Sequence, residues 1–136
     1  MARPKRPNVG DVVEIPLPSG RVAFGRVLRD ASIAVYKENS DDPCDPPIGS
    51  RDYRFVVGIY DDALRGLRVV AHDPNIDADD KWPPPYQATD VLTGQRQIYH
   101  RGEMRPESSS DPTHLEPAAV WDLQHIVDRI EPPSPE

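Results

Sequence analysis

Apolar and polar residues alternate regularly in the first third of the chain. Val13, Ile15 and Leu17 alternate with Glu14 and Pro16, which is the period of a β-strand. Pro18-Ser19-Gly20 then suits a hairpin loop, because proline fixes φ and glycine accepts a left-handed conformation. Alternation resumes over residues 21–28 and, after a turn at Arg29-Asp30, over Ser32–Tyr36. The pattern predicts an antiparallel meander of three strands.

The second of these strands places different side chains on its two faces. One face carries Val22, Phe24, Arg26 and Leu28, and the other carries Ala23, Gly25 and Val27. The small residues of the second face leave room for another element to approach closely. Arg26 is the one residue of the stretch whose identity packing does not explain.

Further elements follow at wider spacing. The apolar run RFVVGIY (54–60) predicts a buried strand, residues 61–66 a helical turn, and LRVVAH (67–72) another strand. Residues 87–100 predict a hairpin about Thr93-Gly94 that pairs Val91 with Ile98 or a neighbour. The segments 38–53 and 73–86 are rich in Asp and Pro and predict surface loops, while 105–111 is polar and predicts little regular structure.

The C-terminal segment has the period of a helix. From Glu116 onward one stripe is apolar, and Pro132-Pro133 end the pattern. The stripe consists of Ala119, Leu123, Ile126, Val127 and Ile130. A sheet covered by one helix buries such a stripe economically. We therefore expect an α+β, mostly β fold in which one C-terminal helix packs on an SH3-like or open barrel-like meander. A single domain would span residues 9–131, between a disordered lead-in (1–8) and a disordered tail (132–136).

Composition limits the classes of function. The 136 residues include 17 prolines, and the formal net charge is −7. Binding to nucleic acid or to anionic membranes requires a basic surface, so neither is expected as a partner. No apolar run approaches the roughly 20 residues of a membrane span, and the basic N-terminus lacks the apolar core of a secretion signal. The sequence predicts a soluble, cytoplasmic protein.

Candidate chemistry is sparse. Cys44, the only cysteine, lies in a loop without the cations that would activate a thiol. The acidic run Asp73–Asp80 resembles a calcium loop, but Ala78 and Pro84 stand where the turn glycine and the bidentate glutamate belong. The four histidines show no metal-ligand spacing, and the tryptophans are most simply packing anchors. We predict no enzyme activity, no cofactor and no metal.

The loops concentrate acidic residues on the predicted β frame. Loops held by a rigid scaffold are the usual place for recognition, and acidic clusters attract basic partners. The alternative is that the charge serves solubility alone. The candidate binding residues are Asp41, Asp42, Asp45, Asp61, Asp62, Asp77, Asp79 and Asp80.

The N-terminal meander also resembles a known family. The order Gly10-Asp11, Ile15-Pro16-Leu17-Pro18, Gly20, Ala23 and Gly25-Arg26-Val27-Leu28 is similar to the immunity protein 26 family of bacterial polymorphic toxin systems. Trp82-Pro83-Pro84, the hairpin about Thr93-Gly94 and a terminal helix near Trp121 are compatible with it. The resemblance is sharp over residues 9–37 and looser to about residue 130, and residues 38–53 and the tail show no match.

The resemblance implies a single-domain, mostly β protein encoded beside a toxin. Such proteins bind and neutralise the toxin in the cytoplasm of the producing cell, and many of these toxins are nucleases. The family contributes no catalytic residues. In this interpretation the acidic loops contact the cognate toxin domain, and a monomer is favoured, although the sequence leaves the oligomeric state open.

A second interpretation belongs to another class. A meander of short strands also resembles the start of an SH3-like barrel, which implies an adaptor that binds a peptide or a partner protein. That function predicts an exposed aromatic groove formed by Tyr36, Tyr60 and Trp82 in place of an acidic surface.

Overall fold

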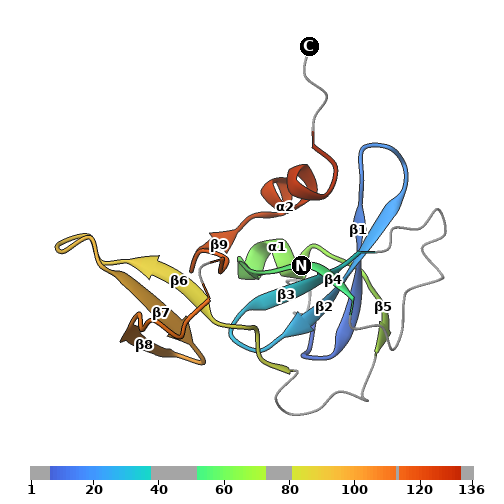
Figure 1. Ribbon diagram of the computed structural model, residues 1–136. Helices are drawn as coiled ribbons and strands as arrows, with labels where there is room; N and C mark the ends of the chain where they lie inside the picture. The colour runs from blue at the N-terminus through green and yellow to red at the C-terminus, as the bar shows by residue number, and fades with distance from the viewer. Residues whose placement is uncertain (1–6, 38–51, 73–80, 113, 133–136) are drawn as a thin grey trace.

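The computed structural model describes residues 7–37, 52–72, 81–112 and 114–132. In these residues the chain forms a six-stranded sheet of order β5-β1-β2-β3-β4-β9 and a three-stranded sheet of order β6-β7-β8 (Figure 1). The elements are β1 (Asp11–Pro16), β2 (Val22–Leu28), β3 (Ser32–Tyr36), β4 (Tyr53–Ile59), α1 (Asp61–Arg65), β5 (Val69–His72), β6 (Tyr86–Thr89), β7 (Arg96–His100), β8 (Glu103–Pro106), β9 (Val120–Trp121) and α2 (Leu123–Ile130). The larger sheet is open, with β5 and β9 at its edges. The predicted α+β, mostly β class is confirmed.

The predicted meander is present in β1, β2 and β3. β1 pairs antiparallel with β2, and β2 pairs antiparallel with β3. In the first loop Gly20 has φ of 88°, and its amide donates to the carbonyl oxygen of Leu17 at 3.0 Å. Glycine adopts this left-handed conformation without steric cost. The hairpin loop therefore forms through the turn chemistry expected of Pro18-Ser19-Gly20.

Both faces of the larger sheet are buried around β2, in which all seven residues are buried. On one face Ala23 and Val27 join the main core, which also contains the apolar side chains of α2. On the other face Phe24 belongs to a smaller apolar cluster. A Cβ atom at Gly25 would lie 2.5 Å from Cδ1 of Ile33. The close approach expected at the small residues is thus made by the neighbouring strand β3.

Arg26 lies on the second face and is fully buried. Its Nη1 donates to the hydroxyl of Tyr53 at 2.8 Å, and its guanidinium lies 5.7 Å from the centre of the Tyr36 ring. The two tyrosine rings are 5.2 Å apart. The hydrogen bond and the ring contact offset part of the cost of burying the charge. Arg26 therefore joins β2 to β3 and β4.

The C-terminal helix is shorter than predicted. It begins at Leu123, not near Glu116, and Asp122 is its N-cap. The carboxylate of Asp122 accepts a hydrogen bond from the amide of His125 at 3.0 Å, which satisfies one of the unpaired donors of the first turn. The helix start is therefore fixed by this side-chain cap.

The residues before the helix form a strand. Val120 and Trp121 make up β9, which pairs in parallel with Gly58 and Ile59 of β4. Ala119 consequently precedes the helix and does not belong to its apolar stripe, contrary to the prediction. A two-residue parallel strand is too short to show a periodic pattern in the sequence. The structure of this segment is therefore determined by its pairing with a distant strand.

α2 packs on the sheet through apolar and cationic contacts. Ile126, Val127 and Ile130 lie in the main core. The guanidinium of Arg129 lies 4.1 Å from the ring centre of Phe55, and it donates two hydrogen bonds to the carboxylate of Glu116. The hydrogen bonds to Glu116 raise the pKa of the Arg129 guanidinium above its ordinary value. The expected packing of one C-terminal helix on the sheet is confirmed.

The register of the β6–β7 hairpin differs from the prediction. Ile98 pairs with Gln87, whereas Val91 lies in the loop between the strands. Asp90 closes this loop: its amide donates to the carbonyl oxygen of Gln95 at 2.8 Å, and its carboxylate accepts from the amide of Leu92 at 2.8 Å. The loop is thus longer than a tight turn at Thr93-Gly94, and loop length sets the register of a hairpin.

A strand was missed at 103–106. The sequence predicted little regular structure from Arg105 onward, but β8 pairs with β7. The two residues between them, Arg101 and Gly102, have φ of 52° and 84°. Positive φ at both central residues is the geometry of a two-residue hairpin turn. An arginine at the first of these positions gave no signal of a turn.

The turn between β2 and β3 holds the smaller sheet against the larger one. The hydroxyl of Ser32 is 2.9 Å from that of Tyr86, and the hydroxyl of Tyr99 donates to Asp30 Oδ1 at 3.1 Å. Next to them, the amide of Arg29 donates to a backbone carbonyl of the segment that leads into β6. These bonds fix the position of the smaller sheet because hydrogen bonds are directional.

A second connection lies at the outer edge of β6. The amide of Gln87 donates to the carbonyl oxygen of Glu116 at 2.9 Å, and the amide of Ala118 donates back to Gln87 at 2.7 Å. The same segment continues directly into β9 of the larger sheet. It therefore links the two sheets, as Figure 1 shows beside β6 and β9.

Gly58 allows β9 to lie against β4. A Cβ atom at this position would lie 2.8 Å from the backbone oxygen of Ala119, so the Gly58→Ala variant must shift backbone. We expect G58A to lower the free energy of unfolding by about 1–3 kcal/mol, as overpacking does. The matched control is Gly66→Ala, where the nearest atom would be 3.5 Å away and φ is −79°. Equal stability of the two variants in denaturant unfolding would contradict the prediction.

Tyr86 makes stability depend on alkaline pH. Burial raises the pKa of Tyr86 from 10.0 to about 12. Between these values the unfolded chain loses the tyrosine proton and the folded chain keeps it, so the free energy of unfolding falls as pH rises from about 10 to about 12. Below about pH 10 this contribution is fully present.

The Tyr86→Phe variant should lack this part of the pH dependence. The Ser32 hydroxyl stays satisfied in Y86F because it also donates to the carbonyl oxygen of Asp30 at 3.1 Å. At neutral pH we expect a loss of about 1 kcal/mol for the missing hydrogen bond. Urea unfolding of both proteins across this pH range measures the difference, and identical slopes would show that Tyr86 is not responsible.

Candidate functional site

The structure describes only part of the predicted acidic surface. Asp61 and Asp62 belong to α1. The other six candidates, Asp41, Asp42, Asp45, Asp77, Asp79 and Asp80, lie outside the described residues, as does Cys44. The candidate site is therefore built from α1 and the residues that the fold brings to it.

Asp61 and Asp62 line a surface depression of about 730 Å³. Tyr60, Ala63 and Asp122 complete its lining. Tyr60 is 54% exposed, so much of its ring faces solvent. The depression thus combines three carboxylates with one accessible aromatic ring, and we refer to it as the acidic depression.

Strand pairing brings Asp122 to this place. Ile59 at the end of β4 pairs with Trp121 at the end of β9, and the amide of Tyr60 donates to the carbonyl oxygen of Trp121 at 3.0 Å. Because the strands are parallel, the residues that follow them, Tyr60 and Asp122, emerge side by side. Sequence reasoning missed Asp122, since nothing local connects it to α1.

Basic side chains lie next to two of the three carboxylates of the depression. Arg65 donates to Asp61 Oδ2 at 2.6 Å, one helical turn away. Nδ1 of His125 lies 3.2 Å from Asp122 Oδ1, and this pair is ionic only when the histidine is protonated. Exposed pairs of this kind are screened by water and worth little individually. The acidic depression therefore gathers three carboxylates at one place on the surface.

A second exposed feature lies at the tip of the β6–β7 hairpin. Val91 and Leu92 are 96% and 93% exposed, and Figure 1 shows this loop far from the larger sheet. The loop is nevertheless ordered by hydrogen bonds, since Asp90 Oδ1 accepts from the amides of Leu92 and Thr93. Val91 and Leu92 thus form an exposed apolar pair on an ordered loop.

The aromatic groove expected of an adaptor is not formed by the three predicted residues. Tyr36 is fully buried, whereas Tyr60 belongs to the acidic depression. Trp82 is half-buried and lies close to the guanidinium groups of Arg29 and Arg101. The three rings therefore do not share one exposed surface.

Other candidate chemistry can be placed only in part. The described residues contain no group of three His, Cys, Asp or Glu side chains arranged to hold a metal ion. The acidic run Asp73–Asp80 lies outside them. Within the same part of the chain, neither helix is long and apolar enough to cross a membrane.

Comparison with known proteins gives no relative. No family model, no curated protein and no solved structure matches the chain.

Asp122 both caps α2 and contributes charge, and these two roles can be separated. Asparagine caps a helix as well as aspartate does, whereas alanine does not. We expect Asp122→Ala to lower the free energy of unfolding by about 0.5–2 kcal/mol and Asp122→Asn to leave it nearly unchanged. Chemical denaturation measures both, and a large loss in D122N would show that the charge itself stabilises the fold.

Proposed function

We propose that this chain is an immunity protein that binds and neutralises a cognate toxin domain in the cytoplasm of the producing cell. The sequence of the meander, from Gly10 to Leu28, supports the family resemblance. The acidic depression supports a protein partner with a basic surface. A nuclease toxin is the partner of this kind that fits best, because its substrate groove must bind phosphates.

The acidic depression is the observation that carries the proposal. Tyrosine is enriched at the energetic centres of protein interfaces, and Tyr60 is accessible there. The carboxylates of Asp61, Asp62 and Asp122 surround it. Charges at the rim of an interface accelerate encounter with an oppositely charged partner and exclude wrong ones. The depression has the composition of a binding surface for a basic protein.

The overall charge agrees with this partner. A net charge of −7 repels nucleic acid and attracts a cationic protein at long range. The adaptor alternative depends on a groove that Tyr36, Tyr60 and Trp82 do not form together. The acidic depression therefore favours the immunity function over the adaptor function.

Co-expression with the toxin encoded beside this gene tests the function. We expect the intact chain to restore growth of cells that express the toxin and to co-purify with it. A catalytically inactive toxin serves to measure the complex without toxicity. If growth is not restored and no complex forms, the chain is not the immunity protein of that toxin.

Neutralising the depression tests which surface binds. We expect the triple variant Asp61→Asn, Asp62→Asn, Asp122→Asn to associate about tenfold more slowly at low salt and to lose most of the salt dependence of the on-rate. The asparagines keep the hydrogen-bond acceptors of α1 and the cap of α2. Stopped-flow or surface-binding kinetics measure the rates.

Single variants provide matched controls. Asp62→Asn and Glu103→Gln each remove one negative charge, but Glu103 lies in β8 of the smaller sheet. We expect Asp62→Asn to slow association and Glu103→Gln to leave the association rate unchanged. Val91→Ser with Leu92→Ser examines the hairpin tip in the same assay. If E103Q slows binding as much as D62N, the effect comes from total charge and the acidic depression is not the contact surface.

A further inference from the structure

A hollow of about 380 Å³ lies at the junction of the two sheets, apart from the acidic depression. Its lining comes from the β2–β3 turn (residues 30–32), Gly58, the smaller sheet (Tyr86, Tyr99 and Met104) and the segment 118–120 that leads into β9. A volume of this size lies within the range of sites for small molecules. We refer to it as the tyrosine hollow.

Most of the lining of the tyrosine hollow is apolar, and part of it faces solvent. Met104 of β8 and Val120 of β9 are 51% and 49% exposed, and both line the hollow. Ala118 and Ala119 also line it, and their small side chains leave space beside the two larger ones. An apolar group inserted there would remove Met104 and Val120 from water, which is favourable.

Two tyrosines give the hollow an aromatic wall that is held in place by hydrogen bonds. Tyr86 and Tyr99 are paired across β6 and β7, and their rings are nearly parallel, with centres 6.5 Å apart. The hydroxyl of Tyr86 lies 2.9 Å from that of Ser32, and the hydroxyl of Tyr99 donates to Asp30 Oδ1 at 3.1 Å. Both rings are thus fixed before any ligand arrives, which lowers the entropic cost of binding.

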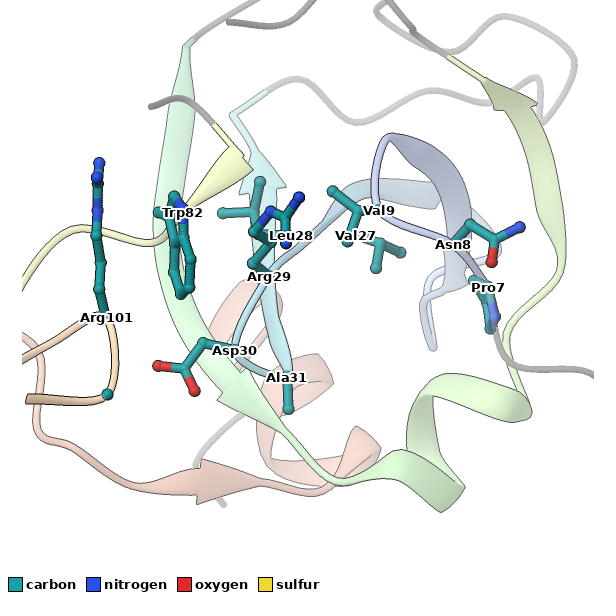
Figure 2. Close-up of a pocket in the computed structure, with 11 residues that line it drawn as sticks. Pro7, Asn8, Val9, Val27, Leu28, Arg29, Asp30, Ala31, Trp82 and Arg101 are labelled. Carbon is teal, nitrogen blue, oxygen red and sulfur yellow. The ribbon is translucent and has the colours of Figure 1, made fainter. Parts of the chain in front are cut away.

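Asp30 is the one charged side chain among the described residues that line the tyrosine hollow. It also lines an adjoining hollow of about 590 Å³, and Figure 2 shows its side chain directed from the β2–β3 turn toward the segment that carries Arg101. A carboxylate can accept several hydrogen bonds, so the bond from Tyr99 does not exhaust Asp30. No basic side chain in the described part of the chain forms an ion pair with Asp30, and the neighbouring Arg29 lies against Trp82. The carboxylate can therefore pair with a cation.

We propose that the tyrosine hollow binds a small organic cation, in which an ammonium group is attached to a compact apolar body. The Asp30 carboxylate accepts a charge-assisted hydrogen bond from the ammonium group. The tyrosine rings attract the same cation through their π systems. The apolar body covers Met104 and Val120. An anion does not fit, because the charge of the lining is negative. The site is independent of the toxin contact proposed above, since the two linings share no residue.

The probe for a binding test is 2-phenylethylamine, and uncharged 2-phenylethanol is its matched analogue. Each is titrated into the full chain labelled with ¹³C at the methionine methyl groups, and the Met104 signal is followed by NMR. The Met104→Leu variant is used once to assign that signal. We expect a saturable shift of the Met104 signal with the amine, and an affinity about tenfold lower for the alcohol, which lacks the charge-assisted hydrogen bond.

Two substitutions show whether Asp30 is responsible. Asp30→Asn removes the charge, keeps an oxygen that accepts from Tyr99, and suits the φ of 62° at this position. Its Tm should therefore stay close to that of the wild type, while its affinity for the amine should fall about tenfold. Its affinity for the alcohol should not change. Asp122→Asn is the matched control, because it removes one negative charge outside this lining. D122N should bind the amine as the wild type does.

Three results would overturn the proposal. A Met104 signal that stays unshifted at millimolar concentrations of the amine rejects the site. Equal affinity for the amine and the alcohol in the wild type would show that charge plays no part, whatever the behaviour of the variants. An unchanged affinity for the amine in D30N, or an equal loss in D122N, would exclude the Asp30 carboxylate as the group that recognises the cation.

Discussion

The polar contacts of the β2–β3 turn hold the two sheets together. Asp30 and Ser32 reach Tyr99 and Tyr86 across the junction, while the Arg29 side chain lies against Trp82. Ser32 and Tyr86 are 54 residues apart along the chain, and Asp30 and Tyr99 are 69 residues apart. Hydrogen bonds are directional, so they set orientation where apolar packing alone would allow sliding. This junction also places the β7–β8 turn beside the β2–β3 turn, and both turns line a hollow of about 590 Å³.

A second long-range contact produces the acidic depression. β9 is only two residues long, yet its parallel pairing with β4 places Asp122 next to Tyr60. The absence of a side chain at Gly58 permits this approach. The same segment then caps α2 and starts the helix that covers the main core. One short strand therefore connects core packing, helix position and the composition of the surface.

Charged side chains gather at two separate places on this acidic protein. The acidic depression gathers three carboxylates of a chain whose formal net charge is −7. At the junction of the two sheets, the guanidinium groups of Arg29 and Arg101 lie against the Trp82 ring.

Local patterns in the sequence determined the meander of β1–β3, its Pro18-Ser19-Gly20 loop and the apolar stripe of α2. Alternation and turn chemistry act between near neighbours, so one segment is enough to reveal them. The start of α2, the register of Ile98 and the strand β8 were decided by pairing with distant segments. The same holds for the acidic depression and for the contact of Trp82 with Arg29, because Asp122 meets Tyr60, and Trp82 meets Arg29, only after strands far apart in the chain have paired. Such contacts leave no periodic signal, since burial and backbone hydrogen bonding across the whole fold select them.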